Sequence, residues 1–172
     1  EIVEVQLGFD GLVMANSVES PVMKLSRKEI FLALAAKVPG DKEGELIDNP
    51  YMTWKQINES FPDDKIEVLG PPPTSGTRDA FVELAMEGGC KAIPWLAAME
   101  KTDKRAFKSI CHTIREDGHF IEAGENDNLI VQKLQANPKA LGIFGFSFLD
   151  QNADSVHGAF IEEVAPEFDS IA

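Results

Sequence analysis

A short apolar strand pattern followed by a helical pattern is the feature that most constrains the fold of this chain. The segment KIEVLG, residues 65–70, has the composition of a short buried strand, and the three prolines at 71–73 end it. From Ser75 onward apolar residues recur at helical spacing, and we expect Gly88-Gly89 to end this helix. A strand that leads directly into a helix favours an α/β domain.

Two segments near the start of the chain extend this alternation. Residues 2–13 alternate apolar and other residues around two glycines, which predicts one strand with a break or two strands. A helix follows, in which Ser26 is the N-cap and Glu29, three residues later, completes a capping box. We expect Pro39-Gly40 to stop this helix and residues 41–50 to form a polar loop.

The rest of the chain continues the pattern. TWKQIN, residues 53–58, predicts a short helical turn, whereas residues 102–124 are ambiguous between helix and strand. ENDNLIVQKLQANP, residues 125–138, predicts a helix, and ALGIFGFSFL, residues 140–149, predicts a buried strand that contains glycines. The order of these elements predicts an α/β domain with a mostly parallel sheet flanked by helices.

Length and charge limit the possible functions. The 172 residues, 44% of them hydrophobic, fit one globular domain with a real core. No apolar run approaches the ~20 residues of a membrane-spanning helix. The chain opens on Glu1 without the basic segment of a signal peptide, so we expect mature protein or a piece of a longer one. The 16 basic and 29 acidic residues give a net charge of −13, which disfavours nucleic acid as a partner.

The turn TSGTR, Thr74–Arg78, has the residue types of an anion site. A helix N-terminus presents unpaired backbone N–H groups and about half a positive charge. Gly76 permits a close approach to the backbone, and the three hydroxyls of the turn can donate hydrogen bonds. Arg78 adds a planar guanidinium suited to tetrahedral oxyanions. Ordinary helix capping by Ser and Thr is the alternative interpretation.

No catalytic or metal motif accompanies this turn. The turn lacks the GK[ST] of a P-loop and the GxGxxG of a dinucleotide site. His112, His119 and His157 lack metal-ligand spacing, and Ser147 does not satisfy GxSxG. We therefore predict no catalytic residue, no metal and no cofactor.

The two cysteines, Cys90 and Cys111, also lack metal-ligand spacing. Their spacing alone leaves two possibilities open. They are either buried free thiols or a disulfide formed in an oxidising compartment.

Several segments together resemble the periplasmic phosphate-binding proteins, the solute-binding components of phosphate ABC importers. SGTRDAFVELAM, residues 75–86, resembles the family's ligand-binding helix, and GFDGLVMANS, residues 8–17, resembles the segment leading to the crossing between its two lobes. Residues 25–39, 53–57 and 124–149 resemble further family segments. The resemblance covers most of the chain, and the Ser-Gly-Thr-Arg helix start is its most specific part.

The resemblance implies that this chain is a single lobe of a two-lobed periplasmic binding protein of type II-like fold. Residues 1–20 would be the lead-in and interlobe-crossing strand region, and residues 21–172 the second lobe without its C-terminal return segment. The implied function is binding of inorganic phosphate in the periplasm. The implied partners are the first lobe of the same protein and an ABC transporter permease.

The resemblance also implies a phosphate site made of Thr74, Ser75, Gly76, Thr77 and Arg78. Asn126 and Asn128, at a second helix start, and Asp10, near the crossing, are possible secondary contacts. Helix capping and a structural turn are the alternatives for these three. A periplasmic location implies a disulfide between Cys90 and Cys111.

Two other functions stay open. A phosphate-handling enzyme could use the same turn as an oxyanion cradle, but the sequence offers no nucleophile or metal carboxylates at suitable spacing, so we expect no enzyme. A binding lobe for another oxyanion, such as sulfate or molybdate, would keep the fold. A buried carboxylate in the first lobe would decide this, because it accepts a proton from phosphate and repels sulfate.

Overall fold

The computed structural model describes residues 12–124, 127–145, 149, 151–158 and 160–161. The chain divides into two compact units. Unit 1 comprises residues 1–25, 67–81 and 121–172, and unit 2 comprises residues 26–66 and 82–120.

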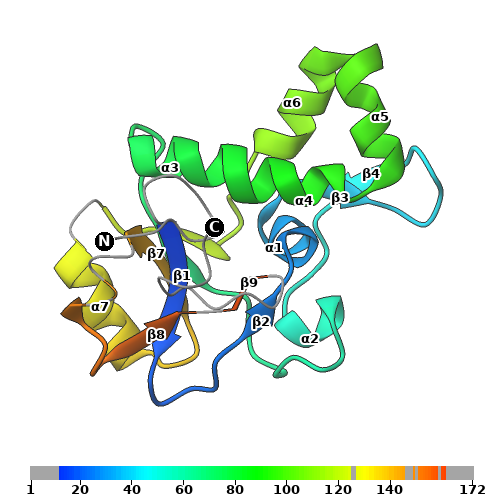
Figure 1. Cartoon of the computed structure of the whole chain (residues 1–172). Helices are drawn as coiled ribbons and strands as arrows, with labels where there is room; N and C mark the ends of the chain where they lie inside the picture. The colour runs from blue at the N-terminus through cyan, green and yellow to red at the C-terminus, as the bar shows by residue number, and fades with distance from the viewer. Residues whose placement is uncertain (1–11, 125–126, 146–148, 150, 159, 162–172) are drawn as a thin grey trace. The chain divides into compact units, whose positions relative to one another are not determined.

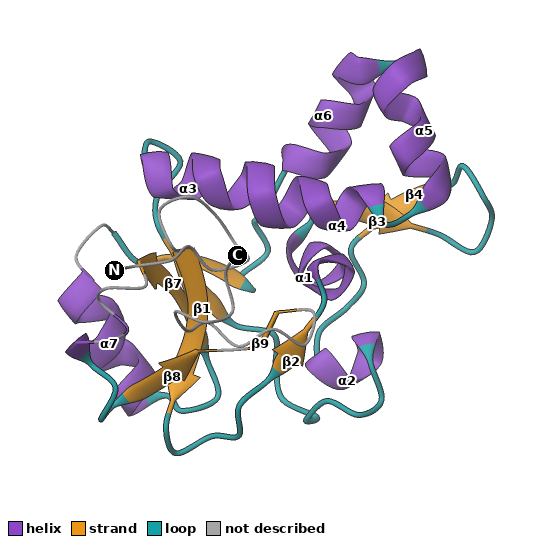
Figure 2. Ribbon diagram, viewed as in Figure 1, coloured by secondary structure: helices purple, strands orange, loops and turns teal. Residues whose placement is uncertain are grey.

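Unit 1 contains a five-stranded sheet with the strand order β6-β5-β7-β1-β8 (Figures 1 and 2). Its strands are β1 (Leu12–Ser17), β5 (Val68–Gly70), β6 (Phe120–Glu122), β7 (Leu141–Gly145) and β8 (Val156–Gly158). β5 and β7 are parallel, whereas β1 is antiparallel to both β7 and β8. Because β5, β7 and β8 share one direction and β1 opposes them, the predicted α/β class with a mostly parallel sheet is confirmed.

Helix α7 (Asp127–Ala136) packs against β7, β1 and β8 of this sheet and builds the core of unit 1 (Figure 1). A Cβ at Gly142 of β7 would lie only 2.8 Å from Ile130 Cγ2, so the glycine lets the helix approach the strand closely. The buried core residues are Val13, Ala15, Leu69, Ala123, Ile130, Val131, Leu134, Ala140, Leu149 and Val156. Unit 1 also contains the parallel pair β2 (Lys24–Leu25) and β9 (Phe160–Ile161).

Unit 2 is mainly helical (Figure 2). Its elements are α1 (Arg27–Leu34), the hairpin β3 (Lys37–Pro39) and β4 (Leu46–Asp48), α2 (Trp54–Ile57), the π-helical turn η1 (Val82–Met86), α4 (Glu87–Lys91), α5 (Pro94–Thr102) and α6 (Lys104–His112). The predicted turn at TWKQIN is confirmed as α2, which Trp54 anchors with 1% of its surface exposed. The ambiguous residues 102–124 form α6 and then β6.

Helix α1 begins as predicted and ends earlier. Glu29 N donates to Ser26 Oγ at 3.0 Å and Ser26 N donates to Glu29 Oε1 at 2.9 Å, which completes the capping box. The helix nevertheless ends at Leu34, because Ala35 has an extended backbone and bridges to Ile114. The prediction that Pro39-Gly40 would stop it was wrong, and so was an entirely polar loop at 41–50, which contains β4.

The prediction that Gly88-Gly89 would end a helix was also wrong. Both glycines lie inside α4, which continues to Lys91. A Cβ at Gly89 would clash with the backbone carbonyl of Arg27 and lie 2.8 Å from Phe31 Cβ. The glycines thus allow α4 to pack closely against α1, and the helix ends only after Lys91.

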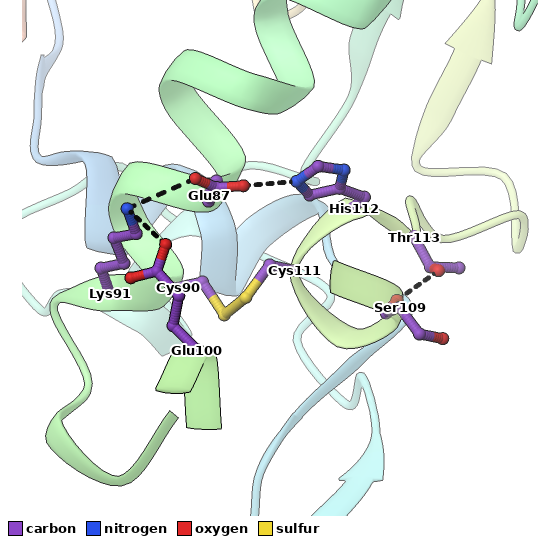
Figure 3. Close-up of a disulfide and its surroundings, with 8 residues drawn as sticks. All are labelled: Glu87, Cys90, Lys91, Glu100, Ser109, Cys111, His112 and Thr113. Carbon is purple, nitrogen blue, oxygen red and sulfur yellow. Dashed lines mark hydrogen bonds and ion pairs between the residues drawn. A yellow bond between two sulfur atoms is a disulfide. The ribbon is translucent and has the colours of Figure 1, made fainter. Parts of the chain in front are cut away.

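A disulfide joins α4 to α6 within unit 2 (Figure 3). It links Cys90 and Cys111, which confirms the predicted pairing. Beside it, Glu87 Oε1 lies 2.7 Å from His112 Nε2, and Glu87 Oε2 lies 3.4 Å from Lys91 Nζ. The Glu87–His112 contact thus joins the same two helices as the disulfide, whereas Lys91, 3.2 Å from Glu100, joins α4 to α5.

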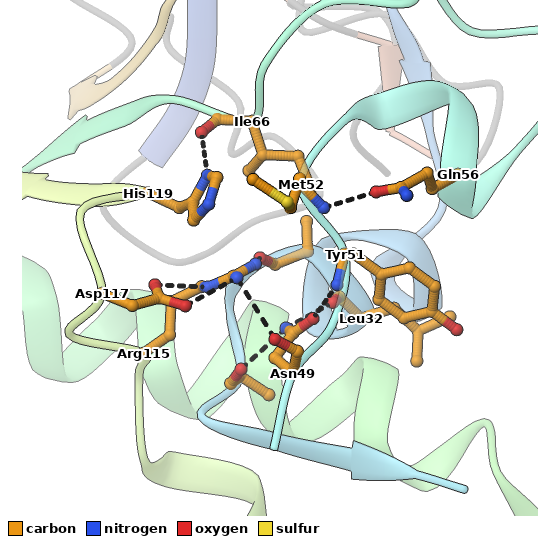
Figure 4. Close-up of polar contacts among 11 residues, drawn as sticks. Leu32, Asn49, Tyr51, Met52, Gln56, Ile66, Arg115, Asp117 and His119 are labelled. Carbon is orange, nitrogen blue, oxygen red and sulfur yellow. Dashed lines mark hydrogen bonds and ion pairs between the residues drawn. The ribbon is translucent and has the colours of Figure 1, made fainter. Parts of the chain in front are cut away.

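A buried arginine fixes the end of α1 (Figure 4). Arg115 is 3% exposed, and its Nε and Nη2 each donate to the Asp117 carboxylate at 2.8 Å. Its Nη1 donates to the Ala33 carbonyl at 2.9 Å, and Asn49 Nδ2 donates to two further carbonyls of this helix end. Because the last four carbonyls of a helix lack intrahelical partners, these side chains replace the missing hydrogen bonds.

Some predicted elements lie partly outside the described residues. The predicted strand at 2–13 falls mostly in residues 1–11, and only its end can be compared with β1. β7 covers residues 141–145 of the predicted strand at 140–149, whose residues 146–148 are also outside. In the part of the chain that the structure describes, every helix is too short or too polar to cross a membrane.

Candidate anion-binding site

The turn TSGTR lies where the sequence places it, between a strand of the sheet and the start of a helix. β5 ends at Gly70, the prolines follow, and α3 (Gly76–Phe81) begins directly after Ser75. The turn therefore lies beyond the carboxyl end of β5. Ligands of open α/β sheets bind at such strand ends.

Ser75 is the N-cap of α3 and is buried, with 3% of its surface exposed. Its carbonyl accepts the N–H of Asp79 at 3.2 Å, and its Oγ accepts the N–H of Thr77 at 3.1 Å. Its own N–H donates to the Pro72 carbonyl at 3.0 Å, which closes the turn. A hydroxyl that accepts one hydrogen bond still has its O–H to donate, so capping does not use up the donor of Ser75.

Neither close packing nor a left-handed backbone conformation requires glycine at position 76. A Cβ built on it would have no neighbouring atom within 4 Å, and it is absent from the described glycines with positive φ. Thr74 and Gly76 are exposed and Thr77 is half-buried. The missing side chain therefore keeps the start of α3 open from the solvent side.

Arg78 lies in the first turn of α3 and contacts a carboxylate from the neighbouring strand. Its Nη1 lies 3.6 Å from Glu122 Oε2, and the two side chains are 14% and 52% exposed respectively. Glu122 is the last residue of β6. The sequence did not single out Glu122, because its approach to Arg78 depends on β6 being the neighbour of β5, which no local pattern specifies.

A second helix starts near the same edge of the sheet. Ala123 N donates to the Gly70 carbonyl at 2.8 Å, so the chain leaves β5 and β6 at the same edge. The segment after β6 leads into α7, whose second residue, Asn128, is exposed. Asn126 and Asp10, the other two possible secondary contacts, lie outside the described residues.

The three histidines lie outside the candidate anion site. His112 contacts Glu87, and the Nδ1 of buried His119 lies 2.7 Å from the Ile66 carbonyl oxygen (Figure 4). Burial lowers the pKa of His157, which lies on β8 opposite Asn16. Among the described residues no cluster of His, Cys, Asp or Glu could hold a metal ion. Ser147 lies outside the described residues.

Comparison with known proteins places this chain in a family. The phosphate-binding protein PstS of Staphylococcus haemolyticus is 25% identical over 160 residues, which are 93% of this chain and 38% of that protein. An ABC-type phosphate transport receptor from Vibrio cholerae has a similar fold, with a TM-score of 0.57 and 21% identity over 96% of this chain and 51% of that one. A possible phosphate-binding protein from Planctomyces limnophilus gives a TM-score of 0.56 and 21% identity over 92% and 45%.

These proteins are longer than this chain, which spans about half of the V. cholerae receptor and less of the S. haemolyticus protein. The family description "PBP superfamily domain" matches residues 1–167, nearly the whole sequence. The α/β sheet is consistent with this match, and the chain belongs to the PBP superfamily.

Proposed function

We propose that this chain binds inorganic phosphate at Thr74, Ser75, Gly76, Thr77 and Arg78, as one lobe of the solute-binding component of a phosphate ABC transporter. The observation that carries the proposal is the open start of α3. There a capping serine, a glycine without a structural reason and an arginine follow one another beyond the end of β5.

The chemistry of this turn suits an oxyanion. The first N–H groups of a helix have no intrahelical acceptors, and the helix dipole places partial positive charge there. The hydroxyls of Ser75 and Thr77 add donors, and Arg78 adds a full positive charge. Such a charge is needed locally, because the net charge of −13 repels anions at long range.

The similar proteins support the choice of ligand and the transport role. Their names describe phosphate-binding and phosphate transport proteins, and this chain corresponds to part of each. We therefore propose a first lobe of the same protein and a permease as partners, and a periplasmic location. The proposal includes a division of the chain into an interlobe-crossing region at residues 1–20 and a second lobe at residues 21–172. It also includes contacts to phosphate from Asn126, Asn128 and Asp10. The proposal includes no catalytic activity.

In a two-lobed binding protein, closure buries the ligand between the lobes and adds hydrogen bonds from the other lobe. A single lobe leaves one side of the anion exposed to water, and solvent-exposed charge pairs contribute only about 0–1 kcal/mol each to the binding free energy. We expect the chain to bind phosphate with a Kd of about 1 mM or weaker, which corresponds to about 4 kcal/mol or less.

Nuclear magnetic resonance titration tests this expectation. Phosphate should shift the backbone amide signals of residues 75–78 without saturating at micromolar concentration. The shifts should be smaller in Arg78→Ala and unchanged in Arg105→Ala, which removes an exposed arginine from α6. Sulfate and molybdate titrations identify the preferred oxyanion. Saturation at micromolar phosphate would contradict the single-lobe proposal, and an absence of shifts at 75–78 would contradict the site.

A further inference from the structure

We infer that Glu122 tunes the charge selectivity of the anion site, because it weakens the binding of doubly charged oxyanions more than that of singly charged ones. The inference rests on the proposed phosphate site at Ser75–Arg78. It assigns a role to a residue that is outside the turn itself and that the structure brings to it.

The position of Glu122 is fixed by the sheet. β6 is the neighbour of β5, and the bond from Ala123 N to the Gly70 carbonyl holds their ends together at 2.8 Å. Glu122, the residue before Ala123, consequently lies beside the turn that follows Gly70. Its carboxylate lies 3.6 Å from Arg78 Nη1.

The contact with Glu122 occupies only part of the hydrogen-bonding capacity of the Arg78 guanidinium. A separation of 3.6 Å is longer than a hydrogen bond, so the pair is a charge–charge contact without a fixed bidentate geometry. A guanidinium has five N–H groups and can face a carboxylate and a second anion together. The side chain of Arg78 is mostly buried, whereas that of Glu122 is half-exposed, so the carboxylate stands on the solvent side of the pair.

The charges of Arg78 and Glu122 nearly cancel at the site. The partial charge at the start of α3, about half an elementary charge, is then the main positive field for a ligand, and the exposed Asp79 in the same helical turn weakens it further. Repulsion from Glu122 grows in proportion to ligand charge. At about 6 Å in water it corresponds to a factor of roughly three in Kd per unit of ligand charge.

The replacement Glu122→Gln in the 172-residue chain tests the inference, because it removes the charge and keeps the shape. The Kd for phosphate would be measured from the amide shifts of residues 76–78 at about pH 5.5, where the monoanion dominates, and at about pH 8.5, where the dianion dominates. Sulfate, a dianion at both pH values, is the second probe. Ionic strength is held constant with chloride.

We expect Glu122→Gln to tighten phosphate binding about three-fold at the lower pH and about ten-fold at the higher pH, and sulfate binding about ten-fold at both. Glu59→Gln, which removes the same charge from an exposed loop position, should leave every Kd within about two-fold. Glu122→Asp keeps the charge and should keep the selectivity of the unchanged chain. Unshifted amide signals in α7, which packs on the sheet that carries Glu122, report that each variant is folded.

Equal gains for singly and doubly charged ligands would overturn the inference, since a charge effect must scale with ligand charge. Weaker binding in Glu122→Gln would also overturn it and show that Glu122 positions Arg78. Either result leaves the phosphate site itself intact. The absence of any shift at residues 76–78 in the unchanged chain would instead remove the proposed function, and the inference with it.

Discussion

The two units of this chain are each stabilised by a different set of interactions. Unit 2 contains a disulfide, a buried arginine with a carboxylate partner, and a chain of charged contacts among α4, α5 and α6. Unit 1 relies on its sheet and on the apolar side chains under α7, and it carries the candidate anion site. Among the residues that the structure describes, most of the covalent and ionic cross-links therefore lie in the unit without the candidate site. Mutations should be able to separate stability from binding.

Two glycines illustrate the same difference on a smaller scale. Gly89 in unit 2 is enclosed, because a Cβ there would clash with the Arg27 carbonyl. Gly76 in unit 1 is open, because a Cβ there would meet nothing within 4 Å. The fold requires the first glycine, whereas the second has open space beside it, as the proposed anion site needs.

Removal of the disulfide should have the largest effect on stability. The double replacement Cys90→Ala and Cys111→Ala opens a loop between residues 21 positions apart, which in the chain-entropy model costs about 3 kcal/mol of unfolding free energy. Urea unfolding measures the loss. Phosphate-induced amide shifts at residues 75–78 should be unchanged while the protein remains folded.

Thiol titration under denaturing, non-reducing conditions provides the control for this experiment. We expect no free thiol in protein matured in an oxidising compartment. Two free thiols would show that the pair is reduced in that protein, and the stability difference would then have to come from packing alone.

Replacing the two glycines by alanine should give opposite patterns. Gly89→Ala forces α4 away from α1 and should lower the unfolding free energy by about 1–3 kcal/mol, with phosphate binding retained. Gly76→Ala should be close to neutral for stability and should weaken phosphate binding, because the methyl group occupies the open start of α3. Urea unfolding and the amide titration together test the pair. A destabilised Gly76→Ala with normal binding would refute the distinction.

Replacement of the capping serine should affect both properties moderately. Ser75→Ala removes the oxygen that accepts the Thr77 N–H and should cost about 1 kcal/mol of stability. It also removes a donor to phosphate, so the Kd should rise. Ser75→Thr restores the hydroxyl and should recover most of both losses, whereas a purely structural cap would leave the Kd of Ser75→Ala unchanged.

The sequence predicted the features that depend on local chemistry. The capping box of Ser26 and Glu29, the strand before the prolines and the helix start after Ser75 all follow from residues within a few positions of one another. The anion-site residues could be proposed for the same reason, since the donors of TSGTR lie next to each other in the chain.

Features that depend on distant packing were missed. Gly88-Gly89 has the composition of a helix end, but the approach of α1 gives those glycines another use. The early end of α1 results from bonds with Ile114 and Arg115, about 80 residues away in the sequence. Glu122 escaped notice because strand order, rather than any neighbouring residue, brings it to Arg78.

The smallest predicted effect concerns pH and lies in unit 2. Burial raises the pKa of Glu87, but the hydrogen bonds and charges of His112 and Lys91 outweigh it, so the net pKa lies below its usual value (Figure 3). A carboxyl group whose pKa is lowered by folding stabilises the protein above its unfolded pKa, and this contribution is lost as the pH falls through the folded pKa. Glu87→Gln should therefore lower the unfolding free energy by about 1 kcal/mol or less near pH 7, and this loss should become smaller near pH 3. Urea unfolding at both pH values measures this, with the exposed Glu116→Gln as the matched control that should show little difference at either. An equal loss at both pH values would mean that Glu87 acts through packing rather than through its charge.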